Sequence, residues 1–163
     1  MADTGQRNLE KRLSGIAISD GVVLARAEVL QSSSVGEVVA RDIAPENIER
    51  ELGRLKWAIA QVADDLRNLS ESISNRVGLA AAAIFEAQRA IALDPALVME
   101  AERIIRDQLV NAEAATWQVL REYELRMLEI DNSVLRERAA DLIEVRRRLL
   151  TALSQIPYPT DTP

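Results

Sequence analysis

The side chains available for chemistry in this chain are carboxylates, hydroxyls and cations, because the 163-residue sequence contains neither histidine nor cysteine. That composition removes the usual general base at neutral pH, the imidazole that accepts phosphoryl groups, and the soft metal ligands. Three acidic pairs remain as candidates for metal binding or acid–base work: Asp64 with Asp65, Glu100 with Glu102, and Glu122 with Glu124. Helical residues one or two positions apart do not face each other, so we interpret these pairs as solvated helix surface.

Two further runs also have a structural interpretation. Ser32 to Ser34 lack a base to activate a hydroxyl, which favours a loop over a nucleophile. Arg146 to Arg148 would suit an anion, but cations in the last turn of a helix also stabilise the helix dipole. Trp57 and Trp117 are interpreted as core or groove-lining residues. Residue chemistry alone therefore predicts that the chain has no metal site and is not catalytic by itself.

The composition bounds the class of protein. With 48% hydrophobic, 28% charged and 3% aromatic residues, the chain is typical of a soluble helical protein. The formal net charge of −6 argues against a general nucleic-acid binder, which needs an excess of lysine and arginine. No apolar run has the length of a membrane span and no secretion signal is evident, so we expect a cytoplasmic location.

The residue pattern at the start of the chain predicts a polar tail over 1–12 and a strand pair over 13–31. In the strand pair, Gly21 supplies the positive φ of a turn. From Pro45 the apolar period changes to about 3.5 residues, which predicts a long helix ending near 74–78 and packed along a neighbour. Its apolar seam consists of Ile48, Leu52, Leu55, Ile59, Val62, Leu66, Leu69 and Ile73.

Four more helical segments are predicted. One covers 79–93, and Asp94 with Pro95 predicts a capped start for the next, which buries Leu97, Ala101, Ile104 and Ile105. Asn111 is a candidate cap for a third, and the break at 131–133 precedes a fourth, in which Leu142, Val145 and Leu149 face the core. The helical domain is thus expected to cover 44–154, followed by a proline-rich tail over 155–163.

Three stretches also match a known family in order and spacing: "SGIAISDGVVLARA" (14–27), "AIFEAQRAIALDPAL" (83–97) and "LRERAADLIEVRRRLL" (135–150). Together they resemble the amino-terminal part of Enzyme I of the phosphoenolpyruvate-dependent sugar phosphotransferase system. The resemblance implies a mainly α fold: a four-helix bundle of antiparallel helices of the HPr-binding type, with a short N-terminal β strand pair. In the family the strand pair belongs to an α/β subdomain, whose remainder carries a phosphorylated histidine in a Gly-Gly-x-x-Ser-His segment.

The family also implies a partner, the phosphocarrier protein HPr or an HPr-like carrier. Carried over position by position, its docking surface falls on Gln88, Ala90, Ile91, Asp94, Leu97, Met127, Leu135 and Arg138. Gln88 stands where the family usually has histidine, and Leu79 to Ala82 replace an acidic cluster that meets basic residues of HPr. The resemblance therefore implies weaker electrostatic steering of a basic carrier here.

Several alternatives stay open at this point. The chain is expected to be either a fragment or a naturally short relative of phosphoenolpyruvate-protein phosphotransferase. It would hold no cofactor itself, because the family uses phosphoenolpyruvate and magnesium in a C-terminal domain that this sequence lacks. A different class of function is a structural or self-associating helical module, in which the 48–73 seam mediates homo-oligomerisation.

Overall fold

The structure is a computed structural model that describes residues 21, 22, 24, 26, 40–130 and 132–156, with no side-chain description for 133–137. The chain divides into two compact units, Met1–Ser32 and Ser33–Pro163. The predicted strand pair over 13–31 lies largely outside the described residues, as do the tail over 1–12 and most of the tail over 155–163. Gly21 is described, and it has the predicted positive φ, of 138°.

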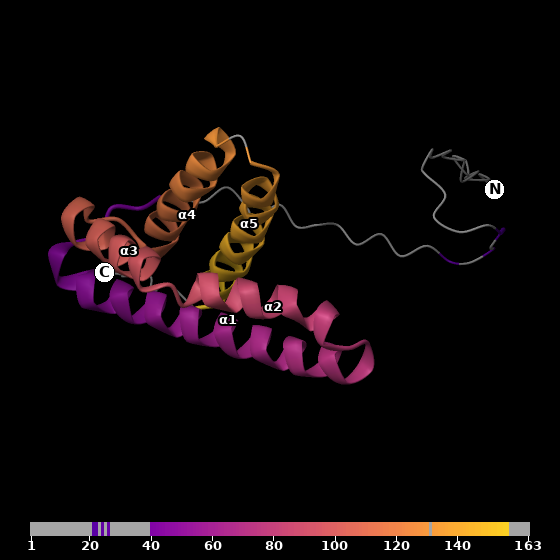
Figure 1. The fold of residues 1–163 in the computed structure, drawn as a ribbon. Coiled ribbons are helices and arrows are strands. Elements are labelled where there is room, and N and C mark those ends of the chain that lie inside the picture. The colour runs from indigo at the N-terminus through magenta and orange to yellow at the C-terminus, as the bar shows by residue number, and fades with distance from the viewer. Residues whose placement is uncertain (1–20, 23, 25, 27–39, 131, 157–163) are drawn as a thin grey trace, which may run out of the picture. The chain divides into compact units, whose positions relative to one another are not determined.

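The second unit is helical throughout its described elements (Figure 1). A 3₁₀ turn, Pro45–Asn47, leads into the α-helices α1 (Ile48–Arg76), α2 (Leu79–Ala92), α3 (Pro95–Gln108), α4 (Ala112–Glu129) and α5 (Ser133–Ser154). The predicted mainly α fold of antiparallel helices is confirmed. The α1–α2 pair crosses the α4–α5 pair, and α3 connects the two pairs (Figure 1). None of the described helices combines the length and apolar content needed to cross a lipid bilayer.

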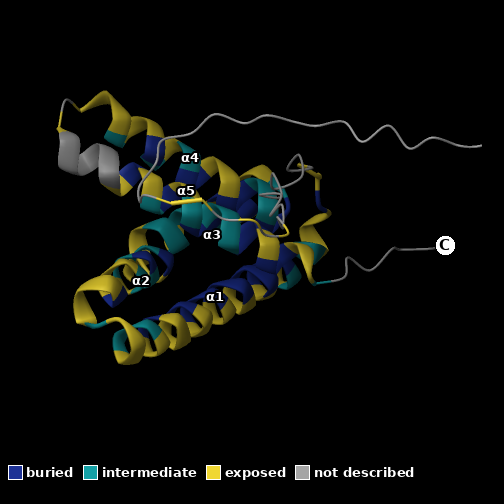
Figure 2. Cartoon of the chain, turned by 90° about the vertical axis from the view of Figure 1, so that its right-hand side faces the viewer, coloured by how far each residue is buried: buried dark blue, intermediate teal, exposed yellow. Residues whose placement is uncertain are grey.

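The predicted seam of α1 forms the centre of the core. Leu52, Leu55 and Leu66 are almost fully buried, whereas Leu69 is 37% exposed, so the core ends about two turns before the helix does. Figure 2 shows the buried residues on the inner faces of the helices. The part of the seam from Leu52 to Leu66 therefore packs against the chain's own helices.

The connection between α2 and α3 follows the sequence prediction. Asp94 precedes Pro95, and its carboxylate accepts a hydrogen bond of 2.8 Å from the backbone N–H of Ala96. This N-cap satisfies one of the donors that a helix start leaves free. Gly78, which separates α1 from α2, has φ of 116°, a conformation that favours glycine.

The start of α4 differs from the prediction. Asn111 occupies the N-cap position, but its side chain accepts from the N–H of Arg41 and donates to Glu113 rather than capping the helix. The N–H of Ala112 instead donates to the fully buried carboxylate of Glu51, at 2.9 Å. The capping prediction for the Asn111 side chain is wrong because a carboxylate from α1 reaches the helix start.

Two other sequence interpretations are corrected. Trp57 and Trp117 are 46% and 44% exposed, because each lies off the core-facing side of its helix. The arginine run 146–148 does not lie in the last turn, since α5 continues to Ser154. These arginines form ion pairs with Glu124 and Glu144, not with the helix end.

Candidate functional site

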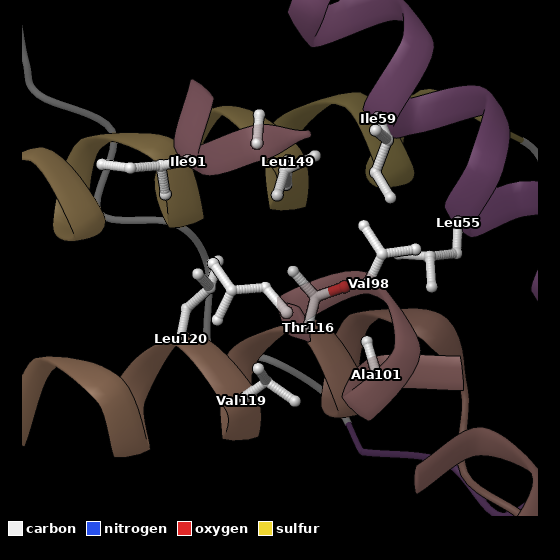
Figure 3. Close-up of a pocket in the computed structure, with 11 residues that line it drawn as sticks. Leu55, Ile59, Ile91, Val98, Ala101, Thr116, Val119, Leu120 and Leu149 are labelled. Carbon is white, nitrogen blue, oxygen red and sulfur yellow. The ribbon is translucent and has the colours of Figure 1, made fainter. Parts of the chain in front are cut away.

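The first half of the predicted docking surface lies where α2 passes into α3. Ala90 and Asp94 are exposed, whereas Ile91 and Leu97 are half-buried. Ile91 and Leu97 line the same small apolar cavity of about 20 Å³ beneath the surface. Figure 3 shows that side chains from all five α-helices converge around it, with Ile91 on one side and Val98 and Thr116 across from it. The apolar centre of the predicted surface is thus continuous with the core.

The second half comes from the α4–α5 pair. Met127 is half-buried and packs on the core, and Arg138 is exposed at 52% of its side chain. Leu135 lies in the first turn of α5, and its side chain is outside the described residues. Arg138 forms an ion pair with Asp141 at 3.6 Å, one turn further along the same helix.

Gln88 is buried, with 5% exposure, unlike the other predicted residues whose side chains the structure describes. It lies on the inner side of α2, and its amide nitrogen donates to Asp141 of α5 at 3.5 Å. Asp141 therefore contacts both Gln88 and Arg138, and it joins the two halves of the predicted surface. The sequence analysis did not select Asp141, because its role depends on the packing of α2 against α5.

The site also includes apolar residues that the sequence analysis did not select. Ile84 is 50% exposed and Leu79 is 80% exposed, both in the first half of α2. Ile84 lies two turns before Ile91, so the two share one face of the helix. One sequence signal could have identified these exposed apolar residues: the run 79–85 carries no charge, which is unusual for the exposed part of a helix.

The charged side chains of the site are paired within the chain. Arg89 lies 3.8 Å from Glu86, Arg138 pairs with Asp141, and the carboxylate of Asp94 caps α3. Among the described residues, no group of three or more acidic side chains is placed to hold a metal ion. The three acidic pairs considered from the sequence make hydrogen bonds or ion pairs with neighbouring side chains instead.

A buried charged network joins α1, α4 and α5. Arg54 of α1 donates to Glu51, to Glu113 of α4 and to the carbonyl of Leu153 in α5. A second network joins Glu124 of α4 to Arg146 of α5. Both networks join helices of the bundle through buried side chains, so we assign them to the scaffold.

The comparisons agree with this fold. Residues 14–138 match the model of the family described as "PEP-utilising enzyme, N-terminal". Phosphoenolpyruvate-protein phosphotransferases of Enterococcus faecalis and Mycoplasma capricolum are 33% and 30% identical over 93% and 88% of this chain. The chain covers 26% and 24% of those relatives, about a quarter of their length.

Solved structures give the same result. An NMR structure of Enzyme I has a TM-score of 0.68 and 28% identity, over 71% of this chain and 46% of that one. The N-terminal domain of Enzyme 1 of the nitrogen type has a TM-score of 0.68 and 25% identity, over 77% of this chain and 52% of that one. A bundle of antiparallel helices with this arrangement is an Enzyme I-type N-terminal fold. The chain belongs to the N-terminal family of PEP-utilising enzymes.

Proposed function

We propose that this chain is a docking domain for an HPr-type phosphocarrier, within a system that transfers phosphoryl groups from phosphoenolpyruvate. The observation that supports the proposal is that Ile91 and Leu97 line one apolar pocket and that Ala90 and Asp94 are exposed beside them. Arg138 is linked to α2 through Asp141, which accepts a hydrogen bond from Gln88. An apolar centre with a polar rim is typical of transient protein interfaces. The relatives are phosphoenolpyruvate-protein phosphotransferases, a name that gives a protein as the phosphoryl acceptor, and the family resemblance suggests an HPr-type carrier as that protein.

The contribution of this domain would be positioning. The chain has no histidine, so it offers no imidazole to accept or pass on a phosphoryl group. Holding two reacting groups in the correct geometry can by itself lower a barrier substantially, because it removes the entropic cost of their encounter. On this proposal the helical domain over 44–154 holds the carrier, and the strand pair over 13–31 belongs to the subdomain that carries the phosphohistidine in the family.

The proposal is tested by NMR titration of the isotope-labelled chain with the unphosphorylated HPr-type carrier of the same organism. We expect chemical-shift changes concentrated at 88–97 and 127–138, the two halves of the surface. The absence of changes at a carrier concentration of about 1 mM would overturn the proposal, because it places the binding free energy above about −4 kcal/mol.

A pair of matched variants makes the test specific. Ala90→Arg adds a bulky side chain at an exposed position of the surface, whereas Ala60→Arg makes the same change at an exposed position of α1 outside it. Arginine is tolerated in helices, so both variants should fold. We expect Ala90→Arg to weaken carrier binding about tenfold or more, which corresponds to 1.4 kcal/mol, and Ala60→Arg to leave it unchanged.

A further inference from the structure

A polar cleft lies between α1 and the last turns of α5, where the two helices pack against each other (Figure 1). Its volume is about 170 Å³, and it shares no residue with the predicted docking surface. The two apolar residues that line it, Val62 and Ala152, are buried. The other lining residues are polar or charged: Gln61 and Asp65 from α1, and Arg147, Arg148, Thr151 and Gln155 from α5 and its C-terminal end.

The α5 side of the cleft carries two guanidinium groups whose donors are only partly used. Arg147 donates from Nε and Nη2 to the carboxylate of Glu144, at 2.8 and 2.6 Å. The Nε of Arg148 lies 2.9 Å from the same carboxylate, but it is buried and has no hydrogen-bond partner. Within the described part of the chain, no N–H group of Arg148 donates a hydrogen bond, although its side chain is only 24% exposed. Because buried N–H groups are nearly always paired, Arg148 keeps donors for an acceptor from outside the chain.

The α1 side of the cleft carries a carboxylate without a cation. Asp65 accepts a hydrogen bond of 3.2 Å from the amide of Gln61, and it forms no ion pair with any residue that the structure describes. Its neighbour Asp64, by contrast, pairs with Arg67 at 3.1 Å and does not line the cleft. Opposite charges therefore line the two sides of one cleft without pairing across it.

We propose that this cleft binds a free α-amino acid, with its carboxylate on Arg147 and Arg148 and its ammonium group on Asp65. Guanidinium groups bind carboxylates through charge-assisted hydrogen bonds, and an ammonium group donates to a carboxylate in the same way. A simple anion would engage only the α5 side, and it would meet Asp65 as a like charge. The amides of Gln61 and Gln155 can exchange hydrogen bonds with a polar side chain of the ligand.

The volume of the cleft limits the size of the ligand. Sites for cofactors and drug-sized molecules usually have about 300 to 1,000 Å³, so a cleft of about 170 Å³ is too small for a nucleotide. A water molecule occupies about 30 Å³ in the liquid, so the cleft has the volume of roughly five or six waters. That volume suits a small polar amino acid such as asparagine. This inference goes beyond the proposed docking function and does not depend on it.

The test is NMR titration of the isotope-labelled chain with L-asparagine, up to about 20 mM. We expect saturable shift changes at 61–65 and 147–155, with a Kd of about 1 mM or tighter. Two analogues of the same size test the two charges: succinamate lacks the ammonium group, and L-asparaginamide lacks the carboxylate. Each should bind about tenfold more weakly or worse, because each leaves the charged groups on one side of the cleft without a partner.

Matched variants make the test specific to the cleft. Arg147→Met and its control Arg103→Met break the same kind of pair, in which Nε and Nη2 hold a glutamate three residues earlier. Asp65→Asn and its control Asp64→Asn make one change at adjacent positions of α1. Arg147→Met and Asp65→Asn should each weaken asparagine binding about tenfold, and the controls should alter it less than about twofold. Asp65→Asn should not weaken the binding of succinamate, which has no ammonium group.

Several results would overturn the amino-acid site. One is the absence of saturable shifts with asparagine at about 20 mM. Another is equal binding of asparagine and succinamate, because the cleft would then recognise a carboxylate alone. A third is equal binding by a cleft variant and its matched control, once circular dichroism has shown that both retain the helical fold. None of these results bears on the docking of a carrier, so the two proposals stand or fall separately.

Discussion

Replacing Arg54 by methionine tests whether the buried charged network holds the bundle together. Arg54 is 6% exposed and links α1 to Glu113 of α4 and to the carbonyl of Leu153 in α5. Its removal leaves the carboxylate of Glu51, which is fully buried, without its 2.8 Å cationic partner. Breaking a buried ion pair from one side costs about 3 to 5 kcal/mol, because the remaining charge is uncompensated. For a chain of this size that corresponds to a Tm lower by about 10 °C.

The assay is urea unfolding of the native chain and of the Arg54→Met variant, monitored by circular dichroism at 222 nm. Thermal melts are recorded alongside. The matched control is Arg106→Met, which breaks a 2.9 Å pair with Glu49 in which both side chains are well exposed. Surface pairs of this kind contribute at most about 1 kcal/mol. A loss below about 1 kcal/mol in Arg54→Met, or a loss equal to that of the Arg106→Met control, would refute the assignment of this network to bundle stability.

Two further predictions concern a helix cap and acid stability. Asp94→Ala should lower the free energy of unfolding by about 1 kcal/mol, whereas Asp94→Asn should be nearly neutral because asparagine also accepts the N–H of Ala96; urea titration distinguishes them. Burial acts to raise the pKa of Glu124, but its hydrogen bonds to Arg146 and Arg121 outweigh that effect and lower the pKa. The unfolded carboxyl, with a pKa of about 4.3, therefore takes up its proton at higher pH than the folded one, so this stabilisation is complete well above pH 4.3 and is lost as pH falls through the folded pKa. The stability difference between the native chain and Glu124→Gln should shrink correspondingly between pH 7 and pH 3; a constant difference would contradict this account.

Local signals in the sequence were sufficient for the helices. The seam from Leu52 to Leu66 was identified from its period because one face of an α-helix repeats every three or four residues, whatever that face packs against. The break at Asp94-Pro95 was equally local, since the cap and the proline act on backbone groups within one turn. Elements of this kind depend on neighbours in the chain, and a sequence contains those neighbours.

The candidate site was predictable only in part. Ile91, Leu97 and Asp94 were named through a family resemblance, and the structure places them together where α2 meets α3. The burial of Gln88 and the exposure of Ile84 were not foreseen. Both depend on which side of α2 faces α5, and amphipathicity is too weak to fix that orientation in a helix that consists largely of alanine.

The sequence by itself thus determined where the helices begin, and it excluded histidine and cysteine chemistry. The tertiary structure alone decided the long-range polar pairing: Glu51 at the start of α4, Arg54 with Glu113 and Leu153, and Asp141 with Gln88. The partners in these contacts lie 53 to 99 residues apart. A carboxylate or guanidinium has no positional preference that identifies such a partner, because the pairing is set by how close the packed helices bring the two groups.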